Sequence, residues 1–327
     1  MWDFSFGGAL SLMWRTMPFI LLRMVIYFGI TLGYILVTGI GAGVGWGIGG
    51  FGDADFRATT TAWGGFAGLG IFGVAMYWAR EYILYIVKAG HVAVLVELID
   101  GKSLPEGRGQ ISHASAVVKE RFPQASLLFA MDQLVKGVIR AITGLVRGLL
   151  TLLPFPGAQQ LSSILSAFLR VAVGFIDEVI LAHAIRQRSE NAWQSAREAL
   201  VLYGQNYKPM LKNAAWLALF VYGLSFLVFV LMLAPAALVA YLIPGAWAAG
   251  GVIFAVLFAW SVKSALLEPL AITCMMQVYF KFIEGQQPNP EWDAKLEQMS
   301  GKFRKLKDRA LGAEPRQSAV PGGAEPS

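Results

Sequence analysis

The sequence predicts an all-α integral membrane protein, a polytopic transmembrane helical bundle with about six spans. Of its 327 residues, 56% are hydrophobic and only 15% are charged, whereas a soluble domain usually has about 25% charged residues. The stretch 213–262 contains no Asp, Glu, Lys or Arg. That stretch is long enough for two spans, because each span needs roughly 20 residues.

The expected spans are the apolar segments that lie between polar or Gly/Pro-rich connections. They cover residues 18–38, 60–87, 125–153, 161–185, 214–239 and 250–280. The third carries a polar stripe of Asp132, Lys136 and Arg140, so it could either span the bilayer or lie at its surface. We predict that it spans, because all strongly basic connections then fall on one side. We also expect Pro235 to break the fifth span.

The distribution of basic residues predicts the orientation. The three expected outer connections contain one base, Arg57, while segments 88–124, 186–213 and 281–327 contain five, five and eight. By the positive-inside rule, both termini are expected in the cytoplasm. The short loops and small size favour a multi-pass protein of a bacterial inner membrane. The expected bundle is then 1–286, with short amphipathic helices in the cytoplasmic segments 88–124 and 186–213.

A basic amphipathic helix is predicted at 287–311. Its apolar residues are spaced four, three, four and three apart, and lysines and arginines occupy the other positions; they are Trp292, Leu296, Met299, Phe303 and Leu306. Such a helix fits anionic lipid at the cytoplasmic face or a partner helix. Residues 312–327 have the composition of a disordered tail. Because the net charge of +6 is explained by topology, no nucleic-acid partner is expected.

Glycines recur at the spacing that brings membrane helices together. In a helix, small residues four apart form a flat stripe that allows close backbone approach. The residues with this spacing are Gly39, Gly41, Gly43, Gly45, Gly47, Gly49, Gly64 and Gly68. They predict tight packing of the first two spans and a homo-oligomer or membrane-protein partner, although a re-entrant turn at 39–52 is also possible.

Carboxylates inside the expected spans are the candidate functional groups, since buried charges at membrane depth commonly line a substrate or ion path. They are Glu81, Asp177, Glu178 and Glu268. Arg80, Arg170 and Lys263 are the expected counter-charges, and the alternative is that these pairs only hold helices in register. His183 is a possible proton switch or a buried, hydrogen-bonded histidine.

Catalytic and metal motifs are missing from the sequence. There is no Ser/His/Asp elbow, phosphate-binding loop or HExxH motif, and the single cysteine, Cys274, lies in an apolar run. We therefore expect no enzyme activity, no cofactor and no metal site.

The segment 199–214, ALVLYGQNYKPMLKNA, resembles the cytoplasmic signature of choline transporter-like membrane proteins. The matching positions are Tyr203, Gly204, Tyr207, Lys212 and Asn213. The resemblance implies a choline-like substrate. The cytoplasmic motif expected in this segment comprises Tyr203, Gly204, Asn206, Tyr207, Lys208 and Pro209. A simpler interpretation is that the two tyrosines anchor at the membrane interface and that Lys208-Pro209 begins the next span.

The leading functional prediction is a transporter or permease for a small polar or cationic solute, which uses the intramembrane carboxylates. The alternative is an oligomeric membrane scaffold that does not transport. In that case the basic C-terminal helix recruits a peripheral partner or binds anionic lipid.

Overall fold

The computed structural model describes residues 2–104, 108–121, 133–138, 144, 176–187, 191–242 and 248–312. Regular structure in these ranges is helical, which confirms the predicted all-α class. The helices are α1 (Phe6–Arg15), α2 (Met17–Gly49), α3 (Ala54–Ile99), α4 (Arg108–Arg121), α7 (Ile176–Gln187), α8 (Ala192–Gln205), α9 (Tyr207–Leu242), α10 (Ala248–Val262), the π-helical turn η1 (Lys263–Leu267), α11 (Glu268–Ile283), α12 (Pro290–Met299) and α13 (Gly301–Gly312).

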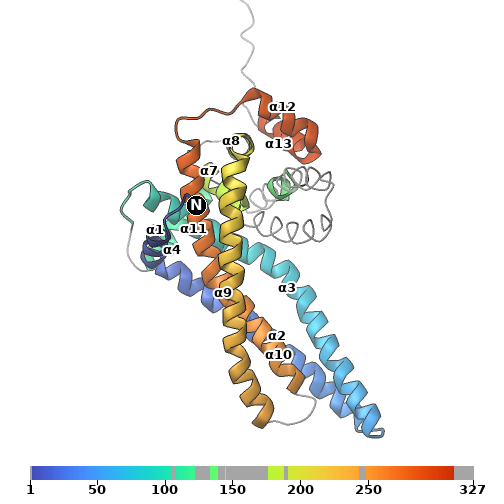
Figure 1. Ribbon diagram of the computed structural model, residues 1–327. Helices are drawn as coiled ribbons and strands as arrows, with labels where there is room; N and C mark the ends of the chain where they lie inside the picture. Colours follow the sequence, from blue (N-terminus) through green and yellow to red (C-terminus); the bar gives the residue numbers. More distant parts are fainter. Residues whose placement is uncertain are drawn as a thin grey trace, which may run out of the picture.

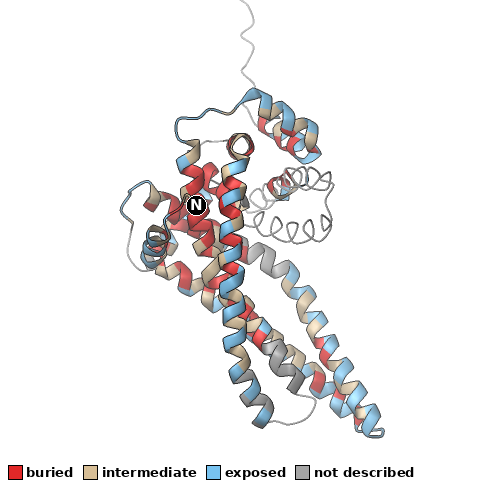
Figure 2. Ribbon diagram, in the orientation of Figure 1, coloured by how far each residue is buried: buried red, intermediate tan, exposed pale blue. Residues whose placement is uncertain are grey.

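Three helical stretches in the described ranges are long and apolar enough to cross a membrane: Met17–Gly49, Tyr207–Ala234 and Ala255–Ile283. They belong to two long hairpins, α2–α3 and α9–α10, which extend from a helical body and turn at the same end of the molecule (Figure 1). Large apolar side chains on these hairpins, such as Val25, Trp63 and Phe226, are exposed (Figure 2). Exposed apolar surface of this extent fits lipid contact, and the chain is a membrane-embedded helical protein.

Buried residues concentrate at the other end of the molecule, where the second half of α3 packs on α7, and α8, α11, α12 and α13 complete the same core (Figure 2). This body has one main core, represented by Leu95, Ile180, Leu200, Met275 and Phe303 from five of these helices. The core lies outside the hairpins, so α3 belongs to both parts. Its first half forms a hairpin with α2, and its second half packs in the body. Its 46 residues correspond to about 69 Å of helix.

Several helices extend past their predicted limits. The glycine-rich run is not a re-entrant turn but the second half of α2, which continues to Gly49. α3 continues to Ile99, into the predicted cytoplasmic segment. The predicted break at Pro235 is wrong, since α9 runs on to Leu242. A proline removes only one backbone donor, and membrane helices tolerate that loss. Most of the predicted spans 125–153 and 161–185 lies outside the described residues.

The predicted single helix at 287–311 is two helices. α12 ends at Met299, Ser300 is extended, and α13 begins at Gly301. Ser300 serves both ends: its N–H donates to the carbonyl of Leu296, and its Oγ accepts from the N–H of Phe303 at 3.3 Å. The apolar side chains of this region face inward, with Leu296, Phe303 and Leu306 fully buried. They cover α8 within the same chain.

Glycines bring α2 and α3 into backbone contact. A Cβ on Gly41 would overlap the Gly64 carbonyl, and one on Gly49 would lie 2.5 Å from the Arg57 Cα. The α2 glycines in this contact are Gly41, Gly45 and Gly49, opposite Gly64 and Gly68 of α3. The intervening row points away: a Cβ on Gly39, Gly43 or Gly47 would meet nothing within 4 Å among the described atoms. The two glycine rows therefore lie on opposite sides of α2.

Candidate charge cluster at the convergence of the hairpins

The candidate site lies where α3 and α11 pack on α7, beside the crossing of α2 with α10 and the π-helical turn η1. α7 begins with Asp177 and Glu178. Glu178 accepts from the ammonium of Lys88 on α3 at 2.7 Å through Oε1. Oδ2 of Asp177 lies 3.5 Å from Nζ of Lys136, in the helical segment 133–138. Both carboxylates are therefore paired with lysines from other segments.

Glu268 joins the same cluster from the α10–α11 rod. Its Oε1 lies 2.6 Å from Nζ of Lys263, which stands at the other end of the π-helical turn. Lys88 also interacts electrostatically with Glu268, in addition to its contact with Glu178. Lys88 thus links the acid of α7 with the acid of α11. Three of the four predicted carboxylates belong to one charge cluster.

The remaining predicted charges fall outside the described side chains. Glu81 and Arg80 belong to α3 by their backbone, and the structure describes neither side chain. Arg170 lies outside the described residues. Of the expected counter-charges, Lys263 is paired, while the lysines that neutralise α7 are Lys88 and Lys136. Sequence reasoning missed both as counter-charges. No local spacing pointed to these pairings, because both lysines come from segments far from α7 in sequence.

Arg23 of α2 is a fourth basic residue of this region, and only 2% of it is exposed. Its Nη2 donates to the carbonyl oxygen of Ser264 at 3.3 Å. The π-helical turn explains why that carbonyl is free. The N–H of Glu268 donates to Lys263, and Pro269 has no N–H to donate. Arg23 therefore supplies the donor that the helix itself lacks.

Polar contacts also fix the crossing of the two hairpins next to Arg23. The hydroxyls of Thr31 on α2 and Ser261 on α10 are hydrogen-bonded, and both residues are buried. Ring packing of Tyr27 against Trp260, with centroids 5.5 Å apart, continues this contact. The charge cluster is therefore built on a fixed helix crossing.

Two buried carboxylate oxygens in the cluster have no hydrogen-bond partner in the described structure: Oδ1 of Asp177 and Oε2 of Glu178. The side chain of Glu178 is 3% exposed and that of Asp177 is 9% exposed. An ionised carboxylate that is buried with a free oxygen costs free energy of folding. These two oxygens are the features of the cluster that ion pairing alone leaves unexplained.

His183 is held by hydrogen bonds further along α7. Its Nδ1 lies 3.1 Å from the Tyr279 hydroxyl, which also faces the Ala199 carbonyl at 3.3 Å. The amide of Gln187 lies 3.4 Å from Nε2. His183 thus connects α7, α8 and α11 in the buried body. The predicted proton switch at this histidine stays a prediction.

The 203–209 motif forms the connection between α8 and α9 and rests on the C-terminal helices. Tyr203 is buried, and Gly204 lies against the ring of Trp292, which also packs on Tyr207 with centroids 5.8 Å apart. Asn206 donates to the side chain of Gln286 at 2.8 Å. Lys208 is exposed, and Pro209 lies in the first turn of α9. In this structure the motif residues form the surface on which α12 and the α11–α12 connection pack.

Lys212 and Asn213, the last two matching positions of the segment 199–214, bind the N-terminal residues of the chain. Lys212 lies 2.7 Å from the carboxylate of Asp3, and Asn213 both accepts from the Asp3 N–H at 2.7 Å and donates to its carboxylate at 2.8 Å. These hydrogen bonds, first from Lys212 and then from Asn213, lower the pKa of Asp3. The rings of Trp2 and Phe6 pack on Phe220. The start of the chain is thus clamped to α9.

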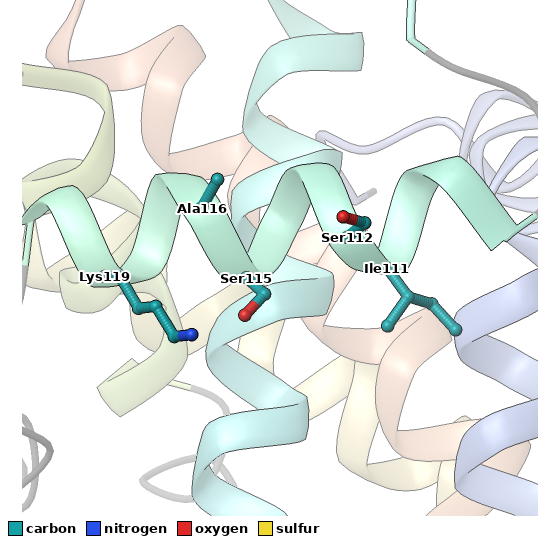
Figure 3. Close-up of a pocket in the computed structure, with 5 residues that line it drawn as sticks. All are labelled: Ile111, Ser112, Ser115, Ala116 and Lys119. Atoms are coloured by element: carbon teal, nitrogen blue, oxygen red, sulfur yellow. The ribbon is translucent and has the colours of Figure 1, made fainter.

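The described surface has an open hollow of about 620 Å³ along α4, lined by Ile111, Ser112, Ser115, Ala116 and Lys119 (Figure 3). All five residues come from one helix, with Ser112 and Ala116 pointing to one side and Ile111, Ser115 and Lys119 to the other (Figure 3). The hollow shares no residue with the charge cluster. Among the described residues, no group of three or more His, Cys, Asp or Glu could hold a metal ion.

Comparisons of the chain with protein-family models, with curated proteins and with solved structures find no match. The resemblance of 199–214 to choline transporter-like proteins therefore remains a prediction from the sequence.

Proposed function

We propose that this protein is a multi-pass transporter or permease of a bacterial inner membrane, with about six spans and both termini in the cytoplasm, that moves a small polar or cationic solute. The buried carboxylate oxygens of Asp177 and Glu178, which have no partner in the described part of the chain, carry this proposal. Charges paired only to hold helices in register have no need of free oxygens, whereas a group that receives a solute or ion does.

The orientation rests on charge and on aromatic side chains. The α2–α3 turn contains Asp53, Asp55 and Arg57, and the described ranges 213–242 and 248–262 of the other hairpin contain no charged residue. Exposed aromatic residues gather near the hairpin turns, as at membrane interfaces: Trp46, Phe51, Phe56, Trp63 and Tyr241. The body contains most of the basic residues. The positive-inside rule then assigns the body to the cytoplasm.

The depth of the cluster follows from helix length. α10 begins at Ala248, and Lys263 follows after fifteen residues, or about 22 Å at the helical rise. The hydrocarbon core is about 30 Å thick. If the end of the α9–α10 hairpin lies at the outer interface, Lys263 and its partner Glu268 lie toward the cytoplasmic boundary of the hydrocarbon and not at its centre. A lysine is tolerated near that boundary, and here Glu268 neutralises it. A solute released from the cluster would therefore enter the cytoplasmic body first.

The test is uptake by proteoliposomes that contain the full chain. Radiolabelled choline, other small quaternary amines and neutral amino acids are supplied outside, and uptake is compared with empty liposomes. We expect uptake by the wild type and loss of it in Glu178→Gln. Glu297→Gln, which alters an ion pair of α12 far from the cluster, is the matched control. Equal uptake by Glu178→Gln and the control contradicts the role of Glu178.

A second candidate is a non-transporting oligomeric scaffold, which the exposed surfaces of the C-terminal helices and of α2 favour. The apolar side of α12 and α13 is covered by α8, and bases outnumber acids on the exposed side. Its exposed bases are Lys295, Lys302, Arg304, Lys305 and Arg309, and its exposed acids are Glu291 and Asp308. The outward glycine row of α2 offers a flat surface to another membrane helix. α12 and α13 lie opposite the hairpin turns, where a peripheral partner has access (Figure 1).

Deletion of the C-terminal region is a poor test of the scaffold, because it would expose the core around Leu296 and Phe303. Arg304→Gln with Lys305→Gln removes two exposed charges and leaves the apolar contacts intact. Lys119→Gln with Lys208→Gln is the control with the same loss of charge elsewhere. If the protein is a scaffold, only the variant with Arg304→Gln and Lys305→Gln loses co-purifying proteins when membranes are extracted in gentle detergent. Its solute uptake is unchanged. Identical sets of co-purifying proteins contradict it.

A further inference from the structure

The occupant of the two free carboxylate oxygens can be inferred from what surrounds them. Asp177 and Glu178 are adjacent in α7, and each has one oxygen on a lysine and the other buried without a partner among the described residues. The two carboxyl groups are immediate neighbours and interact electrostatically with each other. If both were ionised, neither could donate a hydrogen bond to the other, because a carboxylate only accepts. One proton between them would satisfy both oxygens.

Other occupants fit less well. A metal ion needs more ligands than two carboxylate oxygens, and the described residues offer no third acidic, histidine or cysteine ligand. Lys88 and Lys136 hold the opposite oxygens at 2.7 and 3.5 Å, and their charges oppose a divalent metal ion between the two carboxylates. A bridging water would satisfy the oxygens, but it would leave two like charges side by side in a buried site.

We propose that Asp177 and Glu178 share one exchangeable proton between Oδ1 and Oε2. The pair takes the proton from water, its charge changes from −2 to −1, and the protonated carboxyl donates to its ionised neighbour. This extends the proposed function by naming an ion that the cluster carries, and a proton held in this way is what a proton-coupled permease requires. The proposal also explains how two adjacent acids are accommodated in one buried turn of helix.

Among the described residues, the charged groups that face Asp177 and Glu178 come from the elements that pack on α7. α3 contributes Lys88, the segment 133–138 contributes Lys136, and α11 contributes Glu268 through its interaction with Lys88. Lys263 neutralises Glu268. α8 contributes no charged group to the interactions of either carboxylate. Loss of the shared proton would therefore add a negative charge beside Lys88 and Lys136.

The test is infrared difference spectroscopy of the full-length protein in detergent as the pH is raised. We expect a carbonyl band of a protonated carboxylic acid at neutral pH, which shifts in heavy water and disappears at alkaline pH. It should be absent from Asp177→Asn and from Glu178→Gln, and present in Glu268→Gln. A wild-type spectrum without the band, as with a bridging water or two ionised acids, overturns the proposal. So does a band that persists in both α7 variants.

Asp177→Asn also gives a readout that does not depend on spectroscopy. Its amide N–H replaces the shared proton permanently, so this variant should fold and should keep its thermal stability at alkaline pH, where the wild type loses stability. Equal alkaline loss in both proteins contradicts the proposal. If Glu178→Gln does not fold because Lys88 loses its partner, Glu178→Gln with Lys88→Met removes both charges and serves instead. The two proposals fail separately. A protein without solute uptake can still show the band, and a protein without the band can still take up solute.

Discussion

Arg23 donates from Nη2 to the carbonyl oxygen of Ser264, 241 positions away in sequence, at 3.3 Å. The contact joins the first membrane helix to the π-helical turn beside Pro269. It shows how one backbone irregularity can be stabilised from a neighbouring helix. A buried carbonyl without a donor costs roughly 1–3 kcal/mol, so the guanidinium and the turn depend on each other.

Arg23→Met should therefore destabilise the protein by about 1–3 kcal/mol, because the Ser264 carbonyl loses its donor. Pro269→Ala returns an N–H to the helix and should reduce that loss when the two changes are combined. Thermal unfolding in one detergent measures the four proteins of this cycle. Arg15→Met in α1 is the control for loss of a surface arginine. Strict additivity of the two changes contradicts the linkage.

The two glycine rows of α2 predict opposite effects of the same substitution. Gly43→Ala should be neutral or stabilise by up to about 1 kcal/mol, since alanine favours helix and nothing lies near its Cβ. Gly41→Ala should destabilise, because the methyl group would overlap the carbonyl of Gly64. Thermal unfolding of both variants is the measurement. If Gly43→Ala also destabilises, or dissociates an oligomer, the outward row is packed too.

Docking of α12 and α13 should depend on pH only in the acid range. Partial burial raises the pKa of Asp293, but hydrogen bonds from Arg197 and Lys307 outweigh it and hold the pKa below its ordinary value of 3.8. A carboxyl with a lowered pKa in the folded state stabilises above the ordinary value and loses that contribution as pH falls through the lower one. Docking should thus be unchanged from pH 7 to about 5.

Hydrogen exchange at the Phe303 amide, whose helix is held by Asp293, measures this docking. Asp293→Asn should raise its exchange rate at neutral pH, by an amount equivalent to at most about 1 kcal/mol because the pair is partly exposed. The variant should show less acid dependence than the wild type. An equal response to acid in both proteins would mean that another carboxyl controls the docking.

The apolar segments of the sequence predicted the all-α class, the membrane location and the positions of α2, α9 and α10. They could not predict where α3 leaves the bilayer, because apolar residues such as Val92 and Leu95 are buried by other helices of the body and not by lipid. Nor could heptad spacing predict the break at Ser300. The spacing of apolar residues continues across the break, since both short helices cover the same helix, α8.

Sequence reasoning identified the acids of the cluster more successfully than their partners. Carboxylates in apolar segments are conspicuous, so Asp177, Glu178 and Glu268 were evident candidates. Among the bases expected nearby in sequence, Lys263 faces Glu268 across one turn, while Arg80 and Arg170 stay predictions because their side chains lie outside the described part of the chain. Lys88 comes from another helix 90 positions away. Such a pairing depends on how helices pack, which no local pattern in one sequence specifies.

The most direct test of the charge cluster is uptake by a variant that loses both members of its central pair. Lys88→Met with Glu178→Gln leaves no unpaired charge behind, so it should fold with a retention volume and thermal stability close to the wild type. If Lys88 and Glu178 take part in binding the solute or ion, this variant will show no uptake above empty liposomes. Uptake at the wild-type rate would contradict the account and leave the pair a structural contact between α3 and α7.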